Sequence, residues 1–157
     1  MLKKQNRVPL SAAEHLREME DFCSRWKGTV FAFCRVFLGD GDAAEGVTSE
    51  AFVSFVRERD LPTSERGIPS RLLRLALRAT EKCRNGSYQP LQGASQLECA
   101  IQRIPHLERA VVIMRNLLHM DWLALAQVVG LSQTEAHEVW KRGIFQLNDA
   151  LQRDSLK

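Results

Sequence analysis

The chain has 157 residues with a formal net charge of +3, and 45% of its residues are hydrophobic while 26% are charged. These values are typical of soluble globular proteins and exclude a disordered chain. No apolar run approaches the roughly 20 residues that a membrane-spanning helix needs, and the basic N-terminus is not followed by a signal-peptide core. The composition therefore predicts a cytoplasmic protein of one or two domains that does not contact a membrane.

Helical periodicity and capping signals predict three helices in the first half of the chain. A capping box starts a long helix over residues 11–37, and a second helix over 42–57 begins at an Asp-Ala-Ala-Glu run. A third helix is expected over 69–84, because proline is tolerated in the first turn of a helix. The turn-forming residues that follow predict a linker.

The second half shows a different arrangement of helices. Apolar residues recur at helical spacing after Pro105, which predicts one helix. A short helix over Trp122–Val129 has Asp121 at its N-cap and ends at Gly130, and another begins at the capping box of Ser132. Two helices joined by a tight glycine-containing turn are typical of a DNA-reading helix-turn-helix.

No segment alternates between apolar and polar residues with a period of two, so the predicted fold class is all-α. We expect two small helical domains, the second with a helix-turn-helix. Residues 1–85 form the first domain, 86–96 the linker and 97–157 the second domain. Domains of this size bury only about 60% of their unfolded surface. They are therefore expected to pack on each other or on a partner.

The cysteines and histidines do not form the pattern of a catalytic or metal site. The four cysteines include no C-x-x-C pair and no histidine at metal-ligand spacing, so we expect buried reduced thiols. No serine or cysteine nucleophile stands at a suggestive spacing from the four histidines. The sequence therefore predicts no catalytic residue, no metal, no cofactor and no enzymatic activity.

Each half carries a group of motifs in a characteristic order. The first group is Leu38-Gly39-Asp40, Ala44-Glu45 and Glu50-Ala51-Phe52. The second is Ile104-Pro105, Arg109, Trp122-Leu123-Ala124-Leu125-Ala126 and Gly130-Leu131-Ser132. The order and spacing of these motifs resemble regions 2 and 4 of bacterial sigma factors of the extracytoplasmic-function type. The resemblance covers about residues 14–151, and the chain resembles a divergent member of that family.

The resemblance implies a function and three partners. It implies an RNA polymerase sigma factor that directs promoter recognition and transcription initiation, with core RNA polymerase, promoter DNA and an anti-sigma protein as partners. The implied contacts to core polymerase are Glu45, Ser49 and Glu50 on the second predicted helix. Two alternatives stay open: a sigma-like protein-interaction module or regulator that has lost promoter reading, and a free-standing helix-turn-helix regulator.

The third predicted helix carries a one-sided basic stripe. At 100° per residue its four cations fall within an arc of about 80°. Such a stripe is typical of a surface that binds a phosphate backbone, and the alternative is an ordinary solvated face. The resemblance implies that this helix and the loop before it hold the minus-ten strand, through Arg71, Arg74, Arg78 and Lys82 with Thr63 and Arg66.

The predicted recognition helix departs most from the family. The resemblance assigns minus-thirty-five contacts to Gln133, Thr134, His137, Glu138, Lys141 and Arg142. The chain has 15 basic and 12 acidic residues up to Pro90 but 7 of each after it, which together make the 22 and 19 of the whole chain. Phosphate contacts dominate DNA affinity, so this neutral half favours the interaction-module alternative.

Three further positions carry expectations about packing. Gly46 lies inside the second predicted helix, where glycine costs about 0.5–1 kcal/mol, and indicates either close packing or relaxed selection. On the last helix Gly143 shares the core-facing arc, while Phe145 falls on the polar arc. The three tryptophans are expected to anchor the core.

Overall fold

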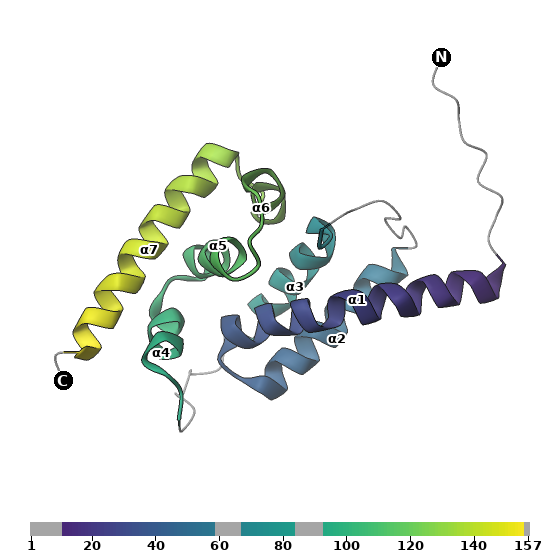
Figure 1. Ribbon diagram of the computed structural model, residues 1–157, viewed down its shortest axis with the longest axis horizontal. Helices are drawn as coiled ribbons and strands as arrows, with labels where there is room; N and C mark the ends of the chain where they lie inside the picture. The colour runs from purple at the N-terminus through teal and green to yellow at the C-terminus, as the bar shows by residue number, and fades with distance from the viewer. Residues whose placement is uncertain (1–10, 59–66, 84–92, 156–157) are drawn as a thin grey trace, which may run out of the picture.

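The computed structural model describes residues 11–58, 67–83 and 93–155, and these fold into seven helices without a strand (Figure 1). The helices are α1 (Ala12–Leu38), α2 (Gly41–Arg57), α3 (Ser70–Lys82), α4 (Gln96–Arg103), α5 (His106–Asn116), α6 (Trp122–Val129) and α7 (Gln133–Ser155). The all-α prediction is confirmed. Within the described residues, no helix has the length and apolarity needed to cross a membrane.

Local capping explains where the first two helices begin. Ser11 and Glu14 form the predicted capping box of α1, in which the Ser11 N–H donates to the Glu14 carboxylate at 2.8 Å. The prediction that Asp42 caps α2 is wrong. Asp40 is the N-cap, because its carboxylate accepts from the backbone N–H groups of Asp42 and Ala43 at 2.8 and 3.0 Å.

In the second half, the sequence prediction missed one helix and placed another correctly. Helix α4 begins at Gln96 after a capping box of Ser95 and Glu98, so the predicted linker 86–96 reaches into it. Helix α6 has the predicted bounds. It ends at Gly130, whose φ of 72° lies in the left-handed region that favours glycine.

The first half (α1–α3) packs against the second half (α4–α7), as Figure 1 shows. Helix α1 contacts α4 and α5, and α3 contacts α6. Side chains of the second half bond to the end of α1: Gln102 donates to the Val36 carbonyl at 2.8 Å and Arg109 to the Phe37 carbonyl at 3.0 Å. One buried apolar cluster includes residues of both halves. The expectation that the halves pack on each other is therefore confirmed.

Two glycines in helices have opposite surroundings. A Cβ at Gly143 would lie 2.6 Å from Val112 Cγ2 and 3.2 Å from the Glu108 carbonyl oxygen, so glycine lets α7 lie close against α5. A Cβ at Gly46 would meet no atom within 4 Å, which excludes the close-packing interpretation there. Phe145 is 75% exposed on α7, on the predicted polar arc.

The cysteines differ from the expectation of four buried thiols. Cys34 is buried, Cys23 and Cys99 are half-buried, and Cys83 is exposed at the end of α3. Burial raises the pKa of the Cys34 thiol to about 11. All four lie within the described residues and none forms a disulfide bond. The prediction was wrong for Cys83 because only one side of the last turn of α3 is covered.

Candidate nucleic-acid interface

The predicted polymerase contacts lie together on the exposed surface of α2. Glu45, Ser49 and Glu50 are all exposed. Glu50 Oε1 forms an ion pair with Lys82 Nζ of α3, so a predicted polymerase contact and a predicted DNA contact bind each other in the free protein. An exposed ion pair of this kind contributes only about 0–1 kcal/mol to the stability of the fold. A binding partner of either residue can therefore replace this ion pair at little cost.

The basic stripe on α3 is present, but three of its four cations are engaged within the chain. Arg71 Nε lies 2.9 Å from Glu58 Oε2, and its guanidinium lies over the ring of Phe55. Arg74 donates to the backbone carbonyl of Gln127 on α6. Arg78 is exposed and forms no ion pair or hydrogen bond to the described residues.

Where the two halves meet, α3, α5 and α6 enclose a pocket of about 460 Å³. Arg74 and Arg78 both line it, so part of the stripe faces the second half of the chain. The Ser70 hydroxyl also donates across this contact to the Ala124 carbonyl at 3.4 Å. The two remaining residues assigned to the minus-ten strand, Thr63 and Arg66, lie outside the described residues.

On α7 the two predicted DNA-binding cations both pair with carboxylates. Lys141 Nζ lies 2.8 Å from Glu138 Oε1, and Arg142 Nε lies 3.3 Å from Glu108 Oε1 on α5. The hydrogen bond from Lys141 lowers the pKa of the Glu138 carboxyl, so this carboxylate is charged at neutral pH. Gln133 and Thr134 are exposed in the first turn. The exposed face of α7 is thus close to neutral.

His137 does not point outward with the other residues assigned to the minus-thirty-five element. Its half-buried ring lies edge-on to Trp122, with ring centroids 5.0 Å apart, and is stacked on Trp140 at 5.8 Å. The two indoles meet edge-on at 5.9 Å. Trp122 and Trp140 pack against the core as expected, but they also form the walls of a surface pocket.

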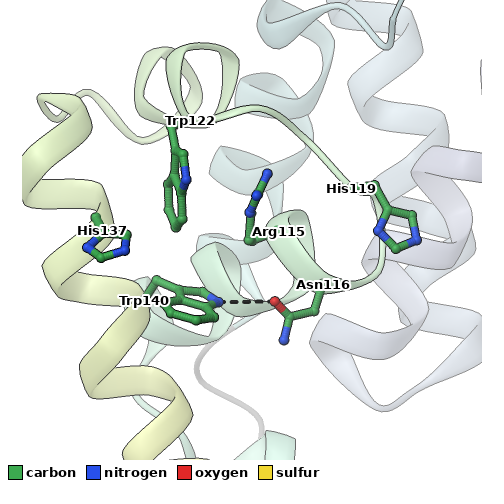
Figure 2. Close-up of a pocket in the computed structure, with 6 residues that line it drawn as sticks. All are labelled: Arg115, Asn116, His119, Trp122, His137 and Trp140. Carbon is green, nitrogen blue, oxygen red and sulfur yellow. Dashed lines mark hydrogen bonds between the residues drawn. The ribbon is translucent and has the colours of Figure 1, made fainter.

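This second pocket has a volume of about 730 Å³, and Figure 2 shows its lining. Six residues from α5, α6, α7 and the segment between α5 and α6 line it: Arg115, Asn116, His119, Trp122, His137 and Trp140. Of these six residues, only His137 was predicted from the sequence to belong to a site. The others gave no signal, because a pocket assembled from separate elements has no fixed spacing along the chain.

These seven helices have the fold of a sigma factor. The structure is similar to that of the sigma factor RpoE in complex with the anti-sigma factor NepR from Bartonella quintana, with a TM-score of 0.68 and 12% sequence identity. The similarity covers 87% of this chain and 98% of that chain. At this identity it shows the fold alone. Neither the known protein families nor the curated proteins contain a match to the sequence.

Proposed function

We propose that the protein is a sigma factor that binds core RNA polymerase and directs it to promoters. The observation that supports this most is an agreement between two independent comparisons. The motifs resembling regions 2 and 4 occur in the two halves of a chain whose fold matches 98% of a known sigma factor. A free-standing helix-turn-helix regulator would not explain the motifs on α2. Catalysis belongs to the polymerase in this proposal.

The proposed roles follow the elements. Glu45, Ser49 and Glu50 on α2 contact core polymerase. The stripe on α3 holds the minus-ten strand, and α7 contacts the minus-thirty-five element through Gln133, Thr134 and Lys141. An anti-sigma protein is a further proposed partner, because RpoE was solved with one.

This function requires the two halves to separate. The minus-ten and minus-thirty-five elements are about 25 base pairs apart, which is about 85 Å of duplex. In the free protein α3 and α6 are in direct contact, and Arg74 donates to the Gln127 carbonyl between them. The compact form therefore cannot occupy both elements at once. We propose that it opens on the polymerase, which releases Arg74 for DNA.

Reconstituted transcription tests the proposed function. Purified protein is mixed with core polymerase and genomic DNA fragments, and new transcript start sites are mapped. The expected result is a defined set of starts that requires both the protein and the core enzyme. Binding to core polymerase without any specific start would contradict promoter direction.

The paired charges on α7 favour a second candidate, a sigma-like module that binds a protein instead of DNA. Glu138 has no capping role and neutralises Lys141 on the exposed face. If α7 meets DNA, Glu138→Lys raises the affinity of the full chain for duplex DNA, while Glu138→Gln raises it less. Fluorescence anisotropy at low salt measures both. No gain from either variant would favour the protein-binding module.

A further inference from the structure

Phe145 is an apolar side chain that the proposed function does not use. It is the most exposed large hydrophobic residue in the described part of the chain. It lies in the middle of α7, and its ring contacts no other aromatic ring of the described residues. Covering apolar surface is favourable in water, so a molecule that packs against this ring would gain free energy.

The residues around Phe145 form one stripe along α7. At 100° per residue, seven positions fall within an arc of about 120° centred on Phe145. These are Glu138, Lys141, Arg142, Phe145, Asn148, Asp149 and Gln152. All are exposed except Asp149, which is partly exposed. Helix α7 packs on α4, α5 and α6, and Figure 1 shows it along the edge of the molecule. The stripe is therefore free to meet another molecule.

The charges on this stripe complement a second copy of the same stripe. When two α7 helices meet antiparallel with their Phe145 rings opposite each other, positions equally far before and after 145 face each other. Lys141 then faces Asp149 of the second copy, and the two-fold symmetry repeats this contact. The other charged positions face neutral residues: Glu138 faces Gln152, and Arg142 faces Asn148. No two like charges of the stripe meet in this arrangement.

A parallel arrangement of the two helices has the opposite property. Each residue then faces its own copy, so Lys141 meets Lys141 and Asp149 meets Asp149. Like charges placed opposite each other destabilise an interface. The charge pattern therefore favours the antiparallel arrangement.

The ion pairs within the stripe do not prevent this contact. Lys141 Nζ lies 2.8 Å from Glu138 Oε1, and Asp149 Oδ2 lies 2.8 Å from Arg153 Nη2. Both pairs are solvent-exposed and join residues three or four positions apart on one helix, and such pairs contribute little to stability. Lys141 and Asp149 can therefore exchange these partners for each other across the contact.

We propose that the chain self-associates through α7, as an antiparallel dimer with two Phe145 rings at its centre and a pair of Lys141 with Asp149 on each side. Two helices that meet over about four turns bury less than the roughly 1,200–2,000 Å² of a stable interface. The dimer is therefore weak and reversible, with a dissociation constant on the order of 100 µM.

The dimer covers Lys141 and Arg142, which are both assigned to the minus-thirty-five element. Self-association and duplex binding by α7 then exclude each other, a consequence that rests on the proposed function. The dimer itself does not depend on that function.

Sedimentation equilibrium of the full chain tests self-association. The protein is studied from about 5 to about 500 µM, a range that spans the expected dissociation constant. A reducing agent is present because the exposed Cys83 would otherwise link two copies by a disulfide bond. We expect a monomer–dimer equilibrium that Phe145→Ala weakens at least about tenfold.

Leu16→Ala, at an exposed leucine on α1, is the matched control and leaves the dissociation constant unchanged. Because the Phe145 ring is exposed, its removal leaves the unfolding transition in urea close to that of the wild type. A chain that is monomeric at every concentration, or a dimer that Phe145→Ala does not weaken, overturns the proposal.

Charge exchange tests the antiparallel arrangement. Lys141→Asp places two carboxylates opposite each other and Asp149→Lys places two ammonium groups opposite each other, so each weakens the dimer at least about fivefold. The double variant Lys141→Asp with Asp149→Lys restores opposite charges at both contacts, and its dissociation constant should return to within about twofold of the wild type. A double variant as weak as the single variants contradicts the antiparallel arrangement.

Duplex DNA separates the dimer from the proposed function. If α7 contacts DNA, a duplex of about 20 base pairs shifts the equilibrium toward the monomer. A dimer that persists in saturating duplex contradicts the minus-thirty-five role of α7 and leaves self-association standing. A monomeric chain that still directs polymerase-dependent transcription removes the dimer and leaves the proposed function standing.

Discussion

The two halves of the molecule carry their charge in different ways. The first half has an excess of basic residues, and its stripe on α3 includes Arg78, which no described residue neutralises. The second half has equal numbers of each sign, and the three cations of α7, Lys141, Arg142 and Arg153, are all paired with carboxylates. The first half is therefore suited to non-specific attraction of a phosphate backbone. The second half offers no such excess of positive charge.

The halves also differ in how tightly their helices pack around glycine. On α7 the absence of a side chain at Gly143 allows contact with α5, whereas Gly46 on α2 faces open space. The same residue type is thus required by packing in the second half but not in the first. This difference shows that α7 lies in close contact with α5 at Gly143, while a side chain at position 46 of α2 would meet no neighbour.

The largest expected effect comes from breaking the contact between the halves at Arg109. Its guanidinium donates to the carbonyls of Phe37 and Gln102, so Arg109→Ala leaves partly buried oxygens without a donor. We expect a loss of about 2–3 kcal/mol in the free energy of unfolding, measured in urea. Arg25→Ala, an exposed control on α1, changes it by less than about 0.5 kcal/mol. Equal stability of the two variants would mean that this contact does not stabilise the fold.

A pair of alanine substitutions sharpens the packing comparison. Gly143→Ala places a methyl group 2.6 Å from Val112 Cγ2 and lowers the free energy of unfolding by about 1–3 kcal/mol. Gly46→Ala meets no neighbour and raises it by about 0.5–1 kcal/mol, because alanine favours the helix. Thermal or urea unfolding measures both. The packing account fails if the two substitutions shift stability in the same direction.

Charge reversal on α2 tests the polymerase contact. Glu50→Lys is expected to weaken association with core polymerase by at least about 1 kcal/mol. Because Glu50 also pairs with Lys82, the double variant Glu50→Lys with Lys82→Glu restores that pair while keeping the reversed charge on α2. Both variants should bind core polymerase weakly in pull-down or biolayer interferometry. Full binding by the double variant would show that the ion pair, and not the α2 surface, matters.

The smallest effect concerns the free cation of the stripe. Arg78→Ala should lower affinity for forked DNA a few-fold and reduce the slope of log K against log[salt] by less than one unit. Arg74→Ala should do less in the compact chain, because Arg74 already donates to α6. Anisotropy across a salt series measures both slopes. Identical behaviour of wild type and Arg78→Ala would reduce the stripe to a solvated face.

The helices were largely predictable because their signals are local. Capping residues and periodicity predict the bounds of α1 and α6 closely, and the sequence carries the same capping-box pattern for α4 at Ser95 and Glu98. The contacts of the site were not predictable. The ion pair between Glu50 and Lys82 and the hydrogen bond from Arg74 to α6 both depend on how segments distant in the sequence pack together. The pocket around Arg115 is likewise a product of tertiary structure.

The central claim is that the two halves of the chain separate on the polymerase, and the distance between α3 and α6 tests it most directly. Cys83 on the exposed end of α3 takes one dye and Gln127→Cys on α6 the other, with Cys23 and Cys99 replaced by serine. Single-molecule energy transfer is then recorded for the free protein and for a transcribing complex with core polymerase. We expect a short separation in the free chain and a separation of about 60 Å or more in the complex. A short separation that persists while promoter-specific transcripts are made would contradict the account.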